Sequence, residues 1–166
     1  MKSNNKAFTL IELLLAMVIL SLLALLLSGS FTTTLKRGRD AQRKNDLSQI
    51  QKALEIYYED ERHYPTFDIF SAATNSQLCT TEACAPTETK YMIKVSKDPT
   101  SSTYKYSYEP TGTYYYLYSY IENEQDQGAG VSITGFTNDA KCNEAGDVVC
   151  RYYVMSSNAT PLTPKP

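Results

Sequence analysis

An apolar run from Phe8 to Leu27 constrains this chain more than any other feature of its sequence. As an α-helix the run would be about 30 Å long, which is roughly the thickness of the hydrocarbon core of a bilayer. One carboxylate, Glu12, interrupts it, and an ionisable group inside such a run is costly unless a partner neutralises it. The run therefore predicts a membrane-spanning helix, and it raises the question of which group pairs with Glu12.

A cleaved signal peptide is the alternative to a membrane span that the residues alone leave open. The run is longer than the apolar region of a cleavable signal peptide, which has about 7–15 residues. A competing cleavage site exists at Ser28-Gly29-Ser30, and a cut there would release a soluble secreted domain that begins at Phe31. A lipoprotein anchor is excluded, because no Cys lies near the run.

Two signals disagree about the side of the membrane on which the rest of the chain lies. Basic residues are more frequent after the run than before it, so a positive-inside count places the C-terminal part in the cytoplasm; they are Lys2 and Lys6 before it, and Lys36, Arg37, Arg39, Arg43 and Lys44 after it. The cysteines form two close pairs, Cys79/Cys84 and Cys142/Cys150, which favour disulfides in an oxidising compartment. Reduced thiols in a cytosolic protein are the alternative. A zinc site is disfavoured because neither pair has the spacing of structural zinc ligands.

The stretch Lys6-Ala7-Phe8-Thr9-Leu10-Ile11-Glu12-Leu13-Leu14 resembles the processing site of type IV prepilins and type II secretion pseudopilins. The resemblance implies a cytoplasmic leader over residues 1–7, cleavage by a prepilin peptidase between Ala7 and Phe8, and methylation of the new amine. Gly is the usual residue at the position of Ala7. Phe8, Thr9 and Glu12 would then serve subunit assembly, with Glu12 meeting the Phe8 amine of a neighbouring subunit. The resemblance also implies that the C-terminal domain lies outside, which outweighs the charge count.

The segment after the apolar run continues as a helix. We expect a transmembrane or filament-core helix over residues 8–29, followed by an amphipathic continuation over residues 30–64. The continuation shows an apolar stripe at three- and four-residue steps that should pack on a globular domain: Leu47, Ile50, Leu54 and Tyr57/Tyr58. From Lys36 to Asp46 the stripe fades, and this polar stretch is expected to meet either other subunits or water. Pro65 is expected to stop the helix.

The remaining chain predicts a globular domain over residues 65–158 and a loose, proline-rich tail over residues 159–166. Tyrosines alternate from 104 to 108 and from 114 to 120, on either side of Pro110-Thr111-Gly112, which is typical of a β-hairpin. Further strands are expected over residues 148–155 and, more weakly, 131–136. Residues 66–103 are expected to be a connecting loop. The tyrosine stripe is interpreted as structural, with a surface for binding sugars as the alternative.

No catalytic, metal or cofactor site is predicted. Enzyme motifs are absent, and Ser102-Thr103-Tyr104-Lys105 fits S-x-x-K without any companion motif. His63 is the only histidine. In the loop over residues 121–130, Glu122, Glu124 and Asp126 offer oxygens of the kind that calcium prefers. Major pseudopilins bind calcium in a loop beyond the hairpin, but this spacing is not theirs, and a solvated acidic loop is favoured.

We therefore predict an α+β, pilin-like fold, in which a long N-terminal helix packs on a small antiparallel sheet. The expected function is that of a structural subunit of a type IV pilus-like filament; the alternatives are a type II secretion pseudopilin and a monomeric membrane-anchored binding domain with the tyrosine face as its site. Expected partners are identical or related subunits, the prepilin peptidase, the assembly machinery and the membrane. Localisation would be the bacterial cytoplasmic membrane and then a periplasmic or extracellular filament.

Charge and cysteine spacing complete these expectations. A net charge of −2 and a pI near 5.4 give no reason to expect nucleic acid as a partner. Local pairing of the cysteines, as Cys79–Cys84 and Cys142–Cys150, follows from their adjacency, because loop-closure entropy grows with separation.

Overall fold

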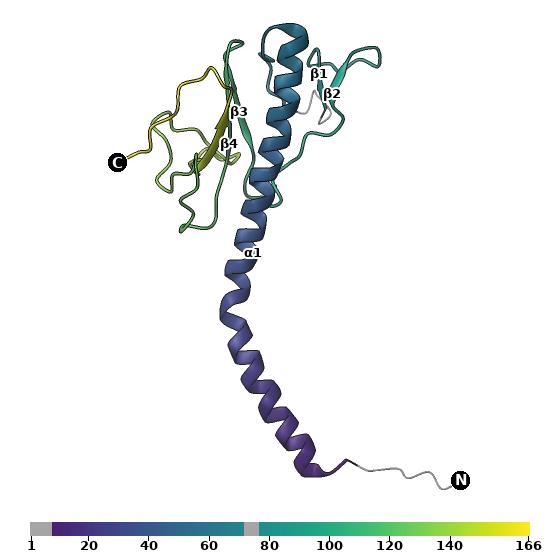
Figure 1. Cartoon of the computed structure of the whole chain (residues 1–166), viewed down its shortest axis with the longest axis vertical. Helices are drawn as coiled ribbons and strands as arrows, with labels where there is room; N and C mark the ends of the chain where they lie inside the picture. The colour runs from purple at the N-terminus through teal and green to yellow at the C-terminus, as the bar shows by residue number, and fades with distance from the viewer. Residues whose placement is uncertain (1–7, 72–76) are drawn as a thin grey trace, which may run out of the picture. The chain divides into compact units, whose positions relative to one another are not determined.

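The computed structural model describes residues 8–71 and 77–166, and the side chains of residues 26–30 lie outside this description (Figure 1). The chain divides into two compact units, residues 1–36 and 37–166. A single helix, α1 (Leu10–Glu61, 52 residues), contributes to both units. Ala7 and the rest of the predicted leader are outside the described residues.

The first unit consists of the N-terminal part of α1. Its apolar side chains face solvent in the single chain: Leu10 is 80% exposed and Leu25 is 74% exposed. Within the described residues, no helix combines the length and the apolar character that crossing a membrane requires.

The second unit is built around the C-terminal part of α1. Leu47, Ile50 and Leu54 are fully buried, and Tyr57 is nearly so, as the predicted apolar stripe requires. The helix ends at Glu61, earlier than the expected residue 64. Arg62 has a positive φ of 60°, and its N–H donates to the carbonyl of Tyr58 at 2.9 Å, so the chain leaves the helix before Pro65 is reached.

A three-stranded antiparallel sheet packs on this part of α1, in the order β3 (Ser107–Pro110), β4 (Tyr115–Ser119), β5 (Tyr152–Met155). The predicted hairpin is confirmed, with Ser107 opposite Tyr118 and Pro110 opposite Tyr115. Gly112 supplies the positive φ of 82° that the turn needs. In Figure 1, β3 and β4 lie along one side of the helical segment.

A second, two-stranded sheet lies within the predicted connecting loop: β1 (Leu78–Cys79) pairs antiparallel with β2 (Lys90–Met92). Periodicity could not indicate strands this short. Leu78 is fully buried and joins the same core as Leu54 and Tyr57, so tertiary packing holds this pair in place.

Two sequence expectations for the C-terminal region are wrong, and a third is confirmed only in part. Residues 131–136 form no strand and contribute only isolated bridges, Val131 to Tyr152 and Phe136 to Pro164. The strand expected over 148–155 is limited to β5. The tail is not loose, because the Lys165 N–H donates to the Gly135 carbonyl at 3.0 Å and the Thr137 N–H to the Thr163 carbonyl at 3.2 Å.

The two faces of the β3–β4–β5 sheet are both covered. Tyr115 and Leu117 of β4 face the α1 stripe, whereas Tyr116 and Tyr118 pack with the C-terminal loops on the opposite face. A helix packed on a small antiparallel sheet is the α+β arrangement that the sequence predicted for a pilin-like fold.

Candidate functional site

The first candidate site is the beginning of α1, where Thr9 and Glu12 form a reciprocal cap. The Thr9 N–H and the Thr9 hydroxyl donate to Glu12 Oε2 at 2.9 and 2.8 Å, and the Glu12 N–H donates to Thr9 Oγ1 at 3.4 Å. This is the capping box of a helix N-terminus, which satisfies N–H groups that have no partner inside the helix. Within one chain, Thr9 is therefore the partner of Glu12.

The sequence did contain a signal for this cap. Thr9 and Glu12 are spaced as T-x-x-E at the start of the apolar run, which is the sequence signature of a capping box. Phe8, the predicted first residue after cleavage, is 84% exposed. Its predicted partner in cleavage, Ala7, lies outside the described residues.

An apolar surface follows this cap along the first unit. Between Glu12 and Lys36 the sequence has no charged residue. The large apolar side chains described there are all substantially exposed, from 45% at Leu35 to 74% at Leu25. An exposed apolar surface of this kind marks a contact with a membrane or with other proteins.

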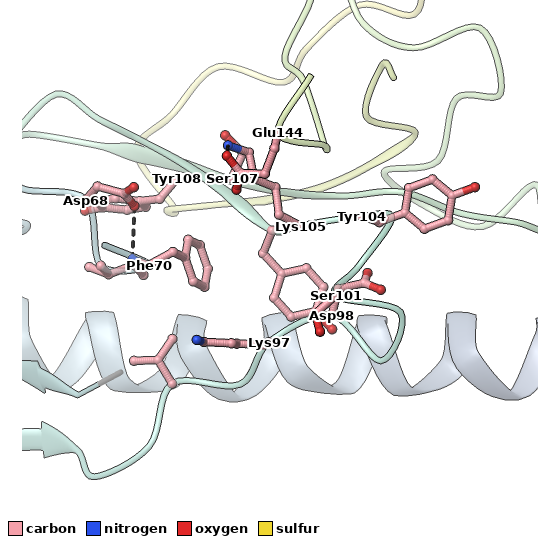
Figure 2. A pocket seen from close by; sticks show the side chains of 13 residues that line it. Asp68, Phe70, Lys97, Asp98, Ser101, Tyr104, Lys105, Ser107, Tyr108 and Glu144 are labelled. Atoms are coloured by element: carbon pink, nitrogen blue, oxygen red, sulfur yellow. Dashed lines mark hydrogen bonds and ion pairs between the residues drawn. The ribbon is translucent and has the colours of Figure 1, made fainter. Parts of the chain in front are cut away.

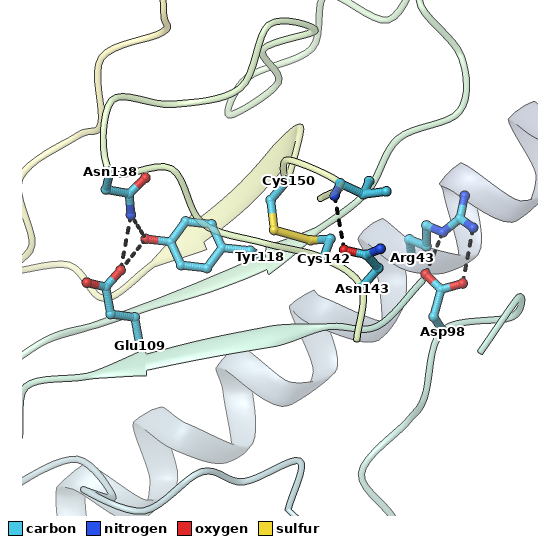
Figure 3. The surroundings of a disulfide bond; sticks show 9 residues. Arg43, Asp98, Glu109, Tyr118, Asn138, Cys142, Asn143 and Cys150 are labelled. Atoms are coloured by element: carbon cyan, nitrogen blue, oxygen red, sulfur yellow. Dashed lines mark hydrogen bonds and ion pairs between the residues drawn. A yellow bond between two sulfur atoms is a disulfide. The ribbon is translucent and has the colours of Figure 1, made fainter. Parts of the chain in front are cut away.

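The second candidate site is an ion cluster that joins α1 to two loops of the second unit. Its centre is Arg43, whose side chain is fully buried. The Arg43 guanidinium donates from Nε to Asp98 Oδ2 at 2.8 Å, and from Nη1 to Asp40 Oδ1 at 2.7 Å and Glu122 Oε1 at 2.8 Å. Nη2 donates to Asp98 Oδ1 at 3.1 Å and to Thr100 Oγ1 at 2.9 Å. Figure 3 shows the paired contact of Arg43 with Asp98.

Neighbouring residues of α1 extend this cluster to the acidic loop. Arg39 makes a two-pronged contact with Glu122, at 2.7 Å from Nε and 2.5 Å from Nη2. Lys44 Nζ donates to Asp126 Oδ2 at 2.6 Å. Asp40 accepts the backbone N–H groups of residues 122 and 123 at 3.0 and 2.8 Å, so the loop is held through its main chain as well as its side chains.

Contacts within the cluster shift the pKa values of Glu122 and Arg43. Hydrogen bonds from Arg39, and next from Arg43, lower the pKa of the Glu122 carboxyl to about 2, against the opposing effect of burial. Burial favours neutral Arg43, but hydrogen bonds to Asp98 and Glu122 outweigh it and raise the pKa of the guanidinium. The contacts therefore stabilise the charged form of both groups.

Two sequence expectations are wrong at this cluster. The polar stretch from Lys36 to Asp46 was expected to meet other subunits or water, yet Asp40, Arg43 and Asp46 are buried within the same chain. The acidic loop was expected to be solvated, yet Glu122 is paired with α1. Apart from Asp40, which is three residues from Arg43, the partners are 55 to 83 residues apart in the sequence, so no local pattern indicated them.

The tyrosine face, considered as an alternative binding surface, is largely covered by the C-terminal loops. Tyr116 is 9% exposed and Tyr118 is 1% exposed. The Tyr118 hydroxyl donates to Glu109 Oε2 at 2.7 Å and accepts from the side-chain amide of Asn138 (Figure 3). The sheet residues 116 and 118 therefore have structural partners, as predicted.

Both predicted disulfides are present, joining Cys79 to Cys84 and Cys142 to Cys150. The second one lies among the loops that cover the tyrosine face, where Cys142 and Cys150 are fully buried (Figure 3). It closes the loop over residues 142–150, in which the Asn143 side chain accepts the Val148 N–H at 3.0 Å.

A cavity of about 370 Å³ lies beside the ion cluster, between the segments 68–70, 95–101 and 104–108 (Figure 2). Its carboxylates already have partners. Asp68 accepts the Phe70 N–H at 3.0 Å, Asp98 accepts from Arg43, and Glu144 lies 3.3 Å from Lys105. Ser102, the first residue of the S-x-x-K stretch, is exposed at the edge of an adjoining pocket, and no histidine lines either one.

Comparison with known protein families supplies the observation that decides the family. The prokaryotic N-terminal methylation motif matches residues 2–28. The family described as type II secretion system (T2SS), protein G matches residues 30–134, which is more than half of the chain. The chain belongs to the type II secretion system protein G family. No curated protein and no solved structure matches the chain significantly.

Membership of the protein G family makes the chain a pilin or pseudopilin subunit, a structural class of protein rather than an enzyme class. Prepilin peptidase processing is implied by the methylation motif. The match to residues 30–134 includes both α1 from residue 30 onward and the acidic loop, so the ion cluster lies within the family region.

The calcium ion that the protein G family implies does not fit the acidic loop. Glu122 is occupied by Arg39 and Arg43, and Asp126 accepts from Lys44 and from the Gly128 N–H at 3.0 Å. Calcium takes about 6–8 oxygen ligands. Over residues 8–71 and 77–166, no three His, Cys, Asp or Glu side chains are placed to hold a metal ion.

Proposed function

We propose that this chain is a pseudopilus subunit of a type II secretion system, anchored in the cytoplasmic membrane by residues 8–29 and then assembled into a filament through the same segment. The main support for this proposal is the apolar surface of the first unit. Nothing in the described part of the chain covers this surface, so it requires lipid before assembly and neighbouring helices after assembly. The described tyrosine face and pocket offer no comparable surface for the alternative function as a monomeric binding domain.

The start of α1 has two successive roles in this proposal. Before cleavage, the Thr9–Glu12 cap lowers the free-energy cost of placing the Glu12 carboxylate near the membrane surface, because Thr9 donates hydrogen bonds to it within the chain. Cleavage between Ala7 and Phe8 then creates a positive amine next to the cap. In the filament, Glu12 pairs with the Phe8 amine of a neighbouring subunit. At about 4 Å and an effective dielectric constant of about 20, the attraction is about 4 kcal/mol before desolvation is subtracted.

Partners follow from these two roles. The prepilin peptidase acts at the membrane on Ala7 and Phe8, the assembly machinery extracts the subunit, and identical or related subunits surround its helix. The second unit lies outside the cytoplasm, a location that agrees with its two disulfides.

The mature N-terminus tests the processing step. Mass spectrometry and N-terminal sequencing of the protein from cells should find a methylated Phe8 as the first residue. An intact Met1 would instead indicate a simple membrane anchor, and a start at Phe31 would indicate a secreted domain. Either of these results would overturn the proposal.

Variants at Glu12 and Thr9 test the assembly step and separate pairing from capping. Glu12→Ala should be inserted and cleaved but should enter filaments poorly beside wild-type subunits, because it lacks the carboxylate. Thr9→Ala keeps the carboxylate and removes the hydroxyl of the cap, so it should assemble close to normally. Quantitative mass spectrometry of purified filaments measures both. Wild-type incorporation of Glu12→Ala would contradict the pairing, and equal losses in the two variants would assign Glu12 to capping alone.

A type IV pilus subunit is the second candidate, and two observations favour it. The Cys142–Cys150 bridge near the C-terminus is similar to the bridged loop of pilins, and the acidic loop as described lacks a calcium donor set. The protein G match over residues 30–134 favours the secretion filament. A deletion strain distinguishes the candidates: retention of secreted enzymes inside the cell supports the pseudopilus, and loss of surface filaments with normal secretion supports the pilus.

A further inference from the structure

Each carboxylate of the acidic loop (residues 121–130) that faces α1 pairs with a basic side chain of that helix. Glu122 meets Arg39 and Arg43, and Asp126 meets Lys44. We infer that Arg43, assisted by Arg39, performs the loop-holding role for which a divalent cation would otherwise be required, so that this subunit folds and keeps its loop ordered without calcium. The inference concerns the single subunit and does not depend on which filament it joins.

The arrangement of oxygens around Arg43 is the first support. Carboxylates from three separate segments converge on one buried guanidinium, since Asp40 belongs to α1, Asp98 to the loop after β2 and Glu122 to the acidic loop. The same three segments would have to be drawn together by a bound cation if the arginine were absent. Their contacts of 2.7–2.8 Å show that the positive charge is already in place.

The geometry of the guanidinium explains why arginine serves this purpose. Its fixed fork directs Nε and Nη2 to both oxygens of Asp98, which leaves Nη1 for Asp40 and Glu122. A lysine ammonium is a compact point charge and lacks this planar fork. Arg43 therefore connects one helix and two loops in a defined geometry, as a coordinated metal ion does.

The other carboxylates at the loop, apart from Glu124, accept hydrogen bonds from backbone N–H groups. Asp126 Oδ1 accepts the Gly128 N–H, and both oxygens of Asp40 accept backbone N–H groups of the loop. Glu124 is 72% exposed and lies 3.6 Å from Arg151, which makes it the only loosely held carboxylate in the acidic loop as described. One such carboxylate falls short of the oxygen set that calcium requires.

Thermal unfolding with and without calcium tests the inference directly. The full chain in detergent micelles should show the same Tm in millimolar calcium chloride as in excess EDTA. A ligand present at about 100 times its Kd would raise the Tm of a chain of this size by roughly 5 °C or more. A calcium-dependent rise of that size in the wild-type chain would overturn the inference, whatever the variants show.

Hydrogen exchange at the loop tests the role of Arg43. Mass spectrometry of the peptide spanning residues 121–128 should show exchange faster by roughly tenfold or more in Arg43→Gln, because the loop loses charged hydrogen bonds. Arg37→Gln is the matched control, since Arg37 is exposed on the same helix and should leave exchange unchanged.

If Arg43→Gln does not fold, a less disruptive variant provides the same test. Arg39→Gln removes only the two-pronged contact with Glu122, and its side chain is 32% exposed, so the fold should survive. Exchange in residues 121–128 should again accelerate, and calcium should not slow it in the wild-type chain. Unchanged loop exchange in Arg39→Gln, or protection of the wild-type loop by calcium, would refute the inference.

Discussion

The two parts of α1 share the same helical backbone but differ in which side chains they bury. From Leu10 to Leu35 its described large apolar side chains face outward, whereas from residue 39 onward charged side chains such as Asp40 and Arg43 are buried. Burial follows the availability of partners within the chain. The second unit supplies carboxylates for Arg43 and an apolar core for Leu54, while the described part of the first unit supplies no core to its leucines. The difference teaches that the described buried contacts of α1 lie in its second part, whereas its first part presents the exposed apolar surface on which the proposed association depends.

Replacing the buried arginine should cause the largest loss of stability in the second unit. Arg43→Met is expected to destabilise the second unit by about 3–5 kcal/mol, because it leaves the carboxylates of Asp40, Asp98 and Glu122 without their shared cation. Denaturant unfolding of the full chain, followed by tyrosine fluorescence, measures the effect. Arg37→Met should change stability little, since Arg37 is exposed. A loss below about 1 kcal/mol in Arg43→Met would show that the cluster contributes little to stability.

A pair of leucine variants sharpens the comparison between the two parts of the helix. Leu54→Ala should cost about 2–5 kcal/mol in the same unfolding measurement, because Leu54 is fully buried in the core. Leu22→Ala, at a side chain that is 59% exposed, should leave unfolding of the second unit unchanged and reduce filament yield instead. Equal unfolding losses in the two variants would contradict the division of roles.

A smaller effect is expected from acid. The folded pKa of Glu122 is about 2, below its ordinary value of 4.5, because of the hydrogen bonds from Arg39 and then Arg43. The unfolded chain therefore takes up the proton first, and the stability contributed by Glu122 is complete above pH 4.5 and is lost as the pH falls toward 2. Glu122→Gln should flatten the dependence of unfolding free energy on pH in this window. Identical pH profiles for the variant and the wild type would contradict the assignment.

Features with a local sequence signal were predictable, and those that depend on distant partners were not. The hairpin was visible because tyrosines alternate on either side of Gly112, and the disulfides because each pair is close in sequence. The cap at Thr9 also had a local signal, the T-x-x-E spacing, although it was not among the predictions. The ion cluster had none, because Asp98 and Glu122 come from loops far from α1 in the sequence. For that reason the polar stretch of α1 was expected to find its partners outside the chain.

The β1–β2 pair and the C-terminal tail illustrate a second limit. Strands of two and three residues have too little periodicity to be recognised, and β1 exists because Leu78 is packed in a core assembled from other elements. The proline-rich composition led us to expect a loose tail, which is wrong. Composition says nothing about backbone hydrogen bonds to Gly135 and Thr137, which hold the tail in place.

The position of the Arg43 cluster along the helix has a mechanical consequence. Any tension carried by the α1 backbone from its N-terminal end passes residues 39–44 before it reaches the apolar stripe that begins at Leu47. The first bonds to bear that load are short, directional contacts to two loops, which deform less before breaking than nonpolar contacts do. Because one guanidinium joins all three segments, a pull on the helix is transmitted to both loops as well as to the core that begins at Leu47.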